Sequence, residues 1–323
     1  MDIDYSVVIR TTGNAGVKYQ KLLESISRLE PSPKEIIVVL PEGYDLPKEQ
    51  LGWESFYFCP KGMVRQRLEG IKYCKTKYAL VCDDDITFEK DFVRKLYHPL
   101  YMGKACFSAG PLYSFLPSGK KSVLFAAITG SAVPALRRNR YISVFKGTGY
   151  SYNKHLRKKS VIETQSIPWT CFFAEVTAFR KLRLEDEKWL DMNGYSAMDD
   201  QSMFYKAWLM GLKTVIVESA KYNHLDAKTS TRNNKPAFLY SFTFNRTVFW
   251  HRFIYMQDRA IFIKAIDVIC FQYRMFWIKF VNKMAVLRGK MDRDDYQILM
   301  RGYHEGLKYV HSEDYKRLPV INK

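Results

Sequence analysis

The sequence predicts an α/β fold with a mostly parallel sheet flanked by helices, and two observations support this prediction. Apolar runs at residues 6–10 and 35–40 are typical of buried strands, and an amphipathic pattern at residues 19–29 predicts a helix between them. Residues 78–82 form another apolar run, which ends in a cluster of acidic residues. Alternation of strand and helix at this spacing predicts βαβ units, so we expect a Rossmann-like sheet with its ligand crevice at the carboxyl ends of the strands.

The remaining elements continue this alternation as far as residue 224. We expect further strands at residues 56–58, 167–173 and 214–217, the last leading to residues 222–224, and helices at residues 63–74 and 199–209. Beyond about residue 235, aromatic and basic residues are interleaved with helical periodicity. We therefore predict one domain at residues 1–235 and a helical, basic and aromatic C-terminal region at residues 236–323. This region either packs on the domain, with its Lys and Arg side chains reaching solvent, or anchors the protein at a membrane interface.

The composition indicates a globular protein with an anionic partner. The 323 residues are 47% hydrophobic, enough for a large core, and the formal net charge of +18 favours nucleic acid, an acidic membrane surface or phosphorylated small molecules. The six cysteines form no CxxC pair, which is typical of reduced thiols in a cytosolic protein. The start of the sequence has no signal-peptide pattern, and the apolar stretch 122–136 is shorter than the ~20 residues of a spanning helix. We expect a cytoplasmic protein.

Residues 92–162 contain no Asp or Glu, although many Lys and Arg residues are present. A segment of this kind, interrupted by the apolar stretch 122–136, suits a surface that faces anionic lipid head groups or a lipid-linked phosphate. The alternative is a solvated basic face with a buried hydrophobic hairpin.

Three consecutive carboxylates, Asp83, Asp84 and Asp85, follow the apolar run at residues 78–82. Like charges on adjacent residues repel, and burying even one carboxylate is costly unless a cation or hydrogen bonds compensate it. A divalent metal ion would compensate all three, because Mg²⁺ and similar ions prefer carboxylate oxygens. The alternative is a solvated acidic turn.

In their order along the chain, several motifs resemble those of glycosyltransferase family 2, a family with the GT-A fold. Residues 6–14, SVVIRTTGN, are similar to the opening strand of the family, usually SVVIPTYN, with Arg10 replacing the proline. Residues 62–71, GMVRQRLEGI, resemble its GxxxQRNxGI helix, with Leu68 replacing the common Asn. The Asp triplet supplies the DxD element, and Asp91-Phe92 fits the spacing behind it.

Two later motifs extend the resemblance over about residues 5–232. Residues 198–204, MDDQSMF, resemble the acidic helix start that carries the catalytic base, and His224 stands where many GT-A enzymes place a metal-binding His. One departure concerns the second strand, since the family often has an Asp there and this chain has Glu42 as a substitute. Residues 238–249 are loosely similar to rhamnosyltransferase-like bacterial members, with the RN dipeptide reversed.

The resemblance implies a role for each of these positions. Asp85 and His224 would hold Mn²⁺ or Mg²⁺, and an imidazole ligand favours Mn²⁺. Asp200 would be the catalytic base, with Asp199 as second choice or helper. The expected nucleotide-sugar-binding residues are Thr11, Thr12, Glu42, Gln66, Arg67, Asp83 and Asp84.

Three further residues have weaker assignments. Lys228 and Arg232 would help Arg67 to neutralise the diphosphate, or are solvated loop charges. Trp169 would stack on an acceptor sugar, or belong to the core.

The function implied is an inverting, metal-dependent glycosyltransferase in bacterial surface polysaccharide (capsule) synthesis. Its donor would be a nucleoside-diphosphate sugar and its acceptor a glycan or a polyprenyl-diphosphate-linked glycan, at the inner face of the plasma membrane. One base without a separate protein nucleophile implies a single displacement. Two alternatives stay open. A metal-dependent nucleotidyltransferase would need a Gly-rich phosphate loop, of which residues 11–16 are a poor version. A nucleic-acid-binding protein would explain the charge but not the Asp triplet, and we expect no nucleic-acid partner.

Overall fold

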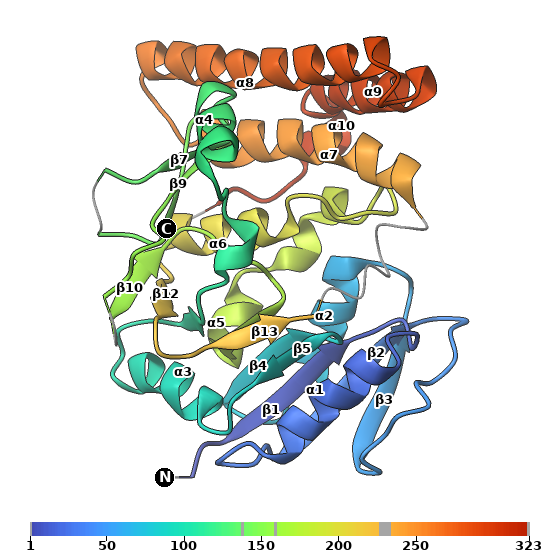
Figure 1. Ribbon diagram of the computed structural model, residues 1–323, viewed down its shortest axis with the longest axis vertical. Helices are drawn as coiled ribbons and strands as arrows, with labels where there is room; N and C mark the ends of the chain where they lie inside the picture. The colour runs from blue at the N-terminus through green and yellow to red at the C-terminus, as the bar shows by residue number, and fades with distance from the viewer. Residues whose placement is uncertain (1, 137–138, 158–159, 226–233, 322–323) are drawn as a thin grey trace.

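The computed structural model describes residues 2–136, 139–157, 160–225 and 234–321. Its centre is an eight-stranded mixed sheet with strand order β10-β12-β6-β11-β4-β1-β2-β3 (Figure 1). Strands β3, β2, β1 and β4 are parallel, β6 and β12 are parallel to each other, and β11 runs antiparallel between β4 and β6. The bounds are β1 Tyr5–Arg10, β2 Glu35–Pro41, β3 Glu54–Cys59, β4 Tyr78–Asp83, β6 Phe107–Ala109, β10 Val161–Thr164, β11 Cys171–Glu175 and β12 Thr214–Val217.

Helices cover both faces of this sheet because successive strand residues point to opposite sides. Val8, Val81 and Phe172 face one side and pack with α2, α5 and α6. Val7 and Leu80 face the other side, where α1 and α3 lie. The predicted α/β fold, with a mostly parallel sheet flanked by helices, is therefore confirmed. The bounds are α1 Val17–Ser27, α2 Met63–Tyr73, α3 Phe92–Tyr101, α5 Val176–Lys181 and α6 Asp199–Leu209.

Two small sheets lie beside the main sheet. Strand β5 (Ile86–Phe88) pairs antiparallel with β13 (Tyr222–His224), in a register that sets His224 opposite Ile86. A three-stranded sheet consists of β7 (Ala132–Pro134), β9 (Tyr150–Tyr152) and β8 (Ile142–Val144). At the end of β4, the β5–β13 pairing thus brings together two segments that are far apart in the sequence.

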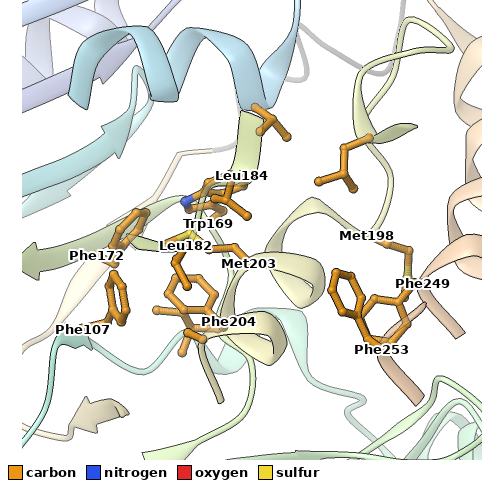
Figure 2. Close-up of a cluster of buried hydrophobic side chains, with 14 of the residues drawn as sticks. Phe107, Trp169, Phe172, Leu182, Leu184, Met198, Met203, Phe204, Phe249 and Phe253 are labelled. Carbon is orange, nitrogen blue, oxygen red and sulfur yellow. The ribbon is translucent and has the colours of Figure 1, made fainter. Parts of the chain in front are cut away.

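The C-terminal segment forms α7 (Lys235–Trp250), a π-helical turn (His251–Tyr255), α8 (Ile261–Leu287), α9 (Arg293–Tyr309) and α10 (Glu313–Lys316). Helix α7 packs on the domain. Figure 2 shows Phe249 and Phe253 beside Met198, and all three belong to the same buried hydrophobic cluster as Phe204. The packed arrangement is thus confirmed for α7, whereas the domain division after residue 235 stays a prediction. None of the helices in the described ranges is long and apolar enough to cross a bilayer.

Two local predictions are wrong. The apolar stretch 122–136 contains no buried hairpin, because Lys120–Ile128 forms helix α4, of which Ala126 is the buried residue. Strand β11 begins at Cys171 rather than at residue 167, since Pro168 has no N–H with which to continue a strand ladder. All six cysteines are free, and four of them are buried.

Candidate active site

The carboxyl ends of β1 and β4 lie side by side, with Arg10 in register with Asp83. Asp83 Oδ1 accepts hydrogen bonds from Arg10 Nε at 3.1 Å and from Arg67 Nη2 at 2.7 Å. Burial by itself lowers the pKa of Arg10, but the neighbouring Asp83 and Asp84 outweigh it, so this pKa is raised. Two cations thus stabilise the first carboxylate of the triplet. We call the set Arg10, Thr11, Asp83, Asp84, Asp85 and His224 the β4 cluster.

Asp84 is held by the loop after β1. The Thr11 hydroxyl donates to Asp84 Oδ2 at 2.5 Å and accepts a hydrogen bond from Gly13 N. Gln66 donates to the carbonyl oxygens of Thr11 and Val39, at 3.0 and 2.9 Å, and so fixes this loop against β2. Burial raises the pKa of Asp84 to about 6, although the Thr11 hydrogen bond lowers it.

The third carboxylate lies against the predicted metal-binding His. Asp85 Oδ1 is 3.3 Å from His224 Nε2, and Leu225 N donates to the Asp85 carbonyl at 2.7 Å. The β5–β13 register therefore brings together the two residues that the resemblance named as metal ligands.

This pair fits a metal ion that shares its coordination sphere with substrate. One carboxylate and one imidazole are suitable ligands for Mn²⁺, and ions of this kind commonly bind one or two protein groups together with phosphate oxygens. Across the described residues, no group of three or more His, Cys, Asp or Glu side chains could hold a metal alone.

Arg67 connects the β4 cluster with the start of α6. Its guanidinium donates to Asp83, and its Nη1 lies 3.5 Å from Asp199 Oδ2. The side chain is only 2% exposed. Burial lowers the pKa of Arg67, and Asp83 opposes this shift. This position favours a role in holding both carboxylates over the direct diphosphate contact that we expected.

Trp169 lies in the core and not on an acceptor surface. It is 3% exposed, and the Arg67 guanidinium covers its ring at 4.4 Å from the centroid. Figure 2 shows Trp169 within the buried cluster, close to Phe172 and Leu184. The prediction that Trp169 stacks on an acceptor is therefore wrong, and the core interpretation holds.

Asp199 and Asp200 open helix α6. Asp199 Oδ1 accepts from Asp200 N at 2.9 Å, and Asp200 Oδ1 accepts from Gln201 N at 2.7 Å. Carboxylates are favoured at this position because a helix N-terminus carries positive potential. Burial nevertheless raises the pKa of both carboxyls, while Arg67 opposes this shift at each of them.

Contacts from other elements fix the loop before α6. Asn245 of α7 is fully buried and donates to the carbonyl oxygens of Leu190 and Ala197, at 3.1 and 2.8 Å. In the same loop, the Asp191 carboxylate accepts hydrogen bonds from the N–H groups of Val64 and Arg65, which lie in the first turn of helix α2. The position of Asp200 thus depends on α2 and α7 as well as on α6.

Asp200 lines two cavities. One, of about 320 Å³, also has walls from Tyr141, Tyr150 and Ile167. The second, of about 260 Å³, contains Asp199, Tyr195 and Arg246. A substrate hydroxyl could therefore reach Asp200. We call Asp199, Asp200, Gln201 and Arg246 the α6 cluster.

Two of the remaining predicted residues, Thr12 and Glu42, form no side-chain hydrogen bond or ion pair with these clusters in the part of the chain that the structure describes. Thr12 is half-buried beside Thr11, and Glu42 is exposed just after β2. Lys228 and Arg232 lie outside the described residues.

Sequence reasoning missed three arginines near the site. Arg10 was noted only as a departure from the family motif, yet it binds Asp83. Arg246 and Arg274 were read as part of the basic and aromatic C-terminal region, and both line cavities near Asp200. The only available signal was the Asn245-Arg246 dipeptide, which resembled a family motif in reverse order.

Comparisons with known proteins agree with this architecture. Residues 57–165 match the model of glycosyl transferase family 2, a range that includes the Asp triplet but not Asp200. No curated protein matches the chain.

Solved structures resemble the chain in fold. GalNAc-T7, crystallised with UDP, GalNAc and Mn²⁺, has a TM-score of 0.53 at 13% identity; the match covers 98% of this chain and 58% of GalNAc-T7. S. aureus TarS 1–349 has a TM-score of 0.51 at 12% identity, covering 94% and 81% of the two chains. Its complex with UDP-GlcNAc gives 0.52 at 10% identity, covering 95% and 82%. The chain thus has a GT-A-like fold, and its residues 57–165 are similar to glycosyl transferase family 2.

Proposed function

We propose that the chain transfers a sugar from a nucleoside-diphosphate sugar to a hydroxyl of a glycan or a lipid-linked glycan, with inversion. The observation that carries this proposal is the Arg67 bridge. A single buried guanidinium bonds Asp83 of the β4 cluster at 2.7 Å and lies 3.5 Å from Asp199 of the α6 cluster. Arg67 thus joins the cluster that contains the proposed metal ligands to the cluster that contains the proposed base, which supports a two-substrate transfer in one site.

The reaction would be a single displacement. The acceptor oxygen attacks the anomeric carbon, the bond from that carbon to the diphosphate oxygen breaks, and the nucleoside diphosphate leaves with the electron pair. The acceptor proton passes to the carboxylate of Asp200 as the new C–O bond forms. Asp200 suits this role better than Asp199, because Asp199 is committed to Arg67 while Asp200 lines both cavities.

Asp85 and His224 would hold the metal ion, which as a Lewis acid would stabilise the charge of the leaving diphosphate. Asp83 is oriented by Arg10 and Arg67, and Thr11 and Gln66 fix the loop beside it. These contacts support a preformed donor site, since the side chains need little rearrangement to receive a ligand. Thr12 and Glu42 stay candidates for contacts to the nucleoside.

The related structures suggest which donors to test first. TarS was crystallised with UDP-GlcNAc, and GalNAc-T7 with UDP, GalNAc and Mn²⁺. We propose a uridine diphosphate sugar as the donor and Mn²⁺ as the metal. A rhamnose nucleotide belongs in the same screen, because residues 238–249 resemble rhamnosyltransferase-like members.

The proposed test is a screen of nucleotide sugars for metal-dependent release of nucleoside diphosphate, with Asp85→Ala and Asp200→Ala as the inactive controls. We expect both substitutions to lower the rate by about 100-fold or more. Release of pyrophosphate from a nucleoside triphosphate, without release of any nucleoside diphosphate from a sugar nucleotide, would identify a nucleotidyltransferase instead.

We also propose that the protein works at an anionic membrane surface, as suits a polyprenyl-diphosphate-linked acceptor in surface polysaccharide synthesis. On α8 an apolar stripe recurs every three or four residues, and its members are between 45% and 67% exposed. They are Phe262, Ile266, Ile269, Tyr273, Phe276 and Phe280. Beside them, α4 exposes Leu124, Phe125 and Ile128, and Tyr273 donates to the Ile128 carbonyl. Figure 1 shows α8 at the end of the molecule opposite the N-terminal strands, with α4 reaching toward it.

The positive charge around this exposed apolar face indicates which kind of partner it binds. Residues 119–130 and 261–290 contain one acidic residue, Asp267, which is buried and paired with Lys146. The exposed cations there include Lys120, Lys121 and Lys283. Two copies of such a face would repel each other, whereas an anionic lipid surface would attract it.

Sedimentation with vesicles tests this surface. We expect binding to phosphatidylglycerol vesicles but not to phosphatidylcholine vesicles at physiological salt, with a loss of at least about tenfold in Ile269→Ser/Phe276→Ser. Phe58→Ser is the matched control, because Phe58 is 47% exposed on β3, outside this face. Equal binding by both variants would contradict the proposal, as would light scattering that shows a dimer dissolved by the double substitution.

A further inference from the structure

Two arginines of the C-terminal helices, the buried Arg246 and the half-buried Arg274, have no acidic partner among the described residues. Arg246 of α7 is 7% exposed and donates from Nη1 to the carbonyl and hydroxyl oxygens of Thr148, at 3.3 and 2.9 Å. Arg274 of α8 donates from Nη1 to the Thr129 carbonyl at 3.2 Å. Among the residues described, no carboxylate lies within 4.0 Å of either guanidinium, and the buried Nε atom of each has no hydrogen-bond partner.

The other buried cations of the described chain are paired. These are Arg67, which binds Asp83, and Lys206 and Arg252, which bind the buried Glu187 at 2.8 and 2.6 Å. The fold thus matches buried charges where it can. Leaving a cation buried and unpaired destabilises a protein, so such groups mark places where an external anion completes the pairing.

The two arginines also act on each other. Burial lowers the pKa of Arg246 to about 9, with the neighbouring Arg274 adding to the shift, and burial lowers that of Arg274 to about 10. Both are still cationic at neutral pH, and a bound anion would relieve their mutual repulsion.

Both guanidiniums line one cavity of about 320 Å³, which we call the arginine cavity. Its other polar lining residues are Gln201 and five hydroxyl-bearing residues, Ser118, Ser122, Ser131, Thr148 and Tyr150. Hydroxyl groups and guanidiniums together form a donor-rich lining, which suits an anion with several oxygen atoms. Within the described residues, no Asp or Glu lines this cavity.

The arginine cavity adjoins the α6 cluster. Gln201 lines the arginine cavity and both cavities of Asp200, and Arg246 lines the arginine cavity and the second of them. On its other side it is bounded by Ser122 of α4 and Arg274 of α8, the two helices of the exposed apolar face. An anion bound here would therefore lie between the candidate base and that face.

We propose that Arg246 and Arg274 bind a phosphate or diphosphate group of the acceptor, so that the acceptor hydroxyl meets Asp200. The identification of this anion as part of the acceptor rests on the proposed function, but the anion site itself does not. Two cations match the double charge of a phosphate or diphosphate better than the single charge of a carboxylate. The phosphate would belong to a lipid-linked diphosphate, which carries two negative charges, or to a phosphodiester within a soluble glycan, which carries one. Both present non-bridging phosphate oxygens, and the charge of the site favours the diphosphate.

Calorimetric titration of inorganic pyrophosphate into the full chain, with EDTA present to remove divalent metals, tests the site. We expect Arg274→Met to weaken binding by at least about tenfold and Arg274→Lys, which keeps the charge, to weaken it less. Asp85→Ala should bind pyrophosphate like the wild type, because Asp85 belongs to the β4 cluster. Unchanged affinity in Arg274→Met, or a loss in Asp85→Ala alone, would overturn the proposal.

Thermal unfolding separates ligand binding from a structural role. Without anions, Arg274→Met removes a half-buried cation that has no acidic partner among the described residues, so we expect an unchanged or higher Tm. Pyrophosphate should raise the Tm of the wild type but not that of Arg274→Met. Should Arg274→Met fail to fold, Arg246→Lys would be tested in its place. We expect this variant to bind pyrophosphate more weakly than the wild type does. Wild-type affinity would overturn the proposal.

A further titration identifies the source of the phosphate. Tighter binding of geranyl diphosphate than of pyrophosphate indicates a lipid-linked acceptor, and binding of a glycerol phosphodiester at least as tight as that of geranyl diphosphate indicates a soluble glycan. If arginine-dependent binding holds while the nucleotide-sugar screen is negative, the proposed function fails and the anion site stands.

Discussion

The β4 cluster and the α6 cluster differ in how their charged side chains are paired. In the β4 cluster each carboxylate has a partner: Asp83 has Arg10 and Arg67, Asp84 has Thr11, and Asp85 has His224. In the α6 cluster, Asp200 accepts a backbone hydrogen bond but has no ion pair within the described chain, and Arg246 has none either.

This difference indicates how each half of the site binds. The paired β4 cluster is organised before a ligand arrives, which suits a nucleotide and metal held in a fixed pose. The unpaired charges of the α6 cluster lower the stability of the free protein, and ligand binding would recover that stability. The comparison therefore predicts which substitutions destabilise the fold and which mainly change the chemistry.

The largest effect is expected where the two clusters meet. Arg67→Met leaves Asp199 without its cation and Asp83 with only Arg10, so we expect a loss of about 3–5 kcal/mol in the free energy of unfolding. Arg246→Met removes a cation without an acidic partner and should cost far less. Denaturant titration measures both variants, and Arg65→Met, at an exposed position of the same helix as Arg67, is the control. Equal losses in Arg67→Met and Arg246→Met would remove the distinction between the clusters.

The metal pair gives the next largest effect. Asp85→Ala or His224→Ala removes one of two neighbouring ligands, so we expect Mn²⁺ affinity to fall by about 10- to 100-fold. Titration of Mn²⁺ followed by electron paramagnetic resonance measures this without any turnover. Asp191→Asn is the control, since Asp191 binds backbone N–H groups of α2 and not the β4 cluster. Unchanged Mn²⁺ binding in both variants would show that the metal site is elsewhere.

A smaller effect concerns pH. Burial raises the pKa of Asp199 and Asp200 above their ordinary values near 4, so the folded protein keeps protons that the unfolded chain has released. Stability from this pair is then present below about pH 4 and falls as pH rises through the raised pKa values, by on the order of 1 kcal/mol. Unfolding of the wild type and of Asp199→Asn/Asp200→Asn, compared between pH 4 and pH 8, measures this slope. Parallel stability curves would disprove the raised pKa values.

The sequence predicted the parallel half of the sheet and the β4 cluster well, because both depend on local patterns. Apolar runs identified β1, β2 and β4, and the Asp triplet marked the end of β4. The partners of these carboxylates were harder to predict, since Arg10 is 73 residues away from Asp83. Only the strand register brings them together.

The α6 cluster was predicted less completely, because its surroundings come from distant helices. Helical periodicity placed Arg246 and Arg274 in the C-terminal region but does not specify how α7 and α8 cross. For Trp169 the sequence left two roles open, stacking on an acceptor sugar or packing in the core. The contact of Arg67 with its ring decides between them, and the sequence does not reveal that contact. Tertiary packing, rather than local pattern, decides both points.

The central claim is that donor binding and proton removal belong to separate clusters joined through Arg67. Binding of UDP with Mn²⁺ to Asp200→Asn, measured beside its rate of sugar transfer or donor hydrolysis, tests this most directly. The account predicts wild-type UDP affinity together with a rate at least about 100-fold lower, because Asp200 takes the proton and does not touch the nucleotide. If Asp200→Asn weakens UDP binding as much as Asp85→Ala does, or keeps the wild-type rate, the account is contradicted.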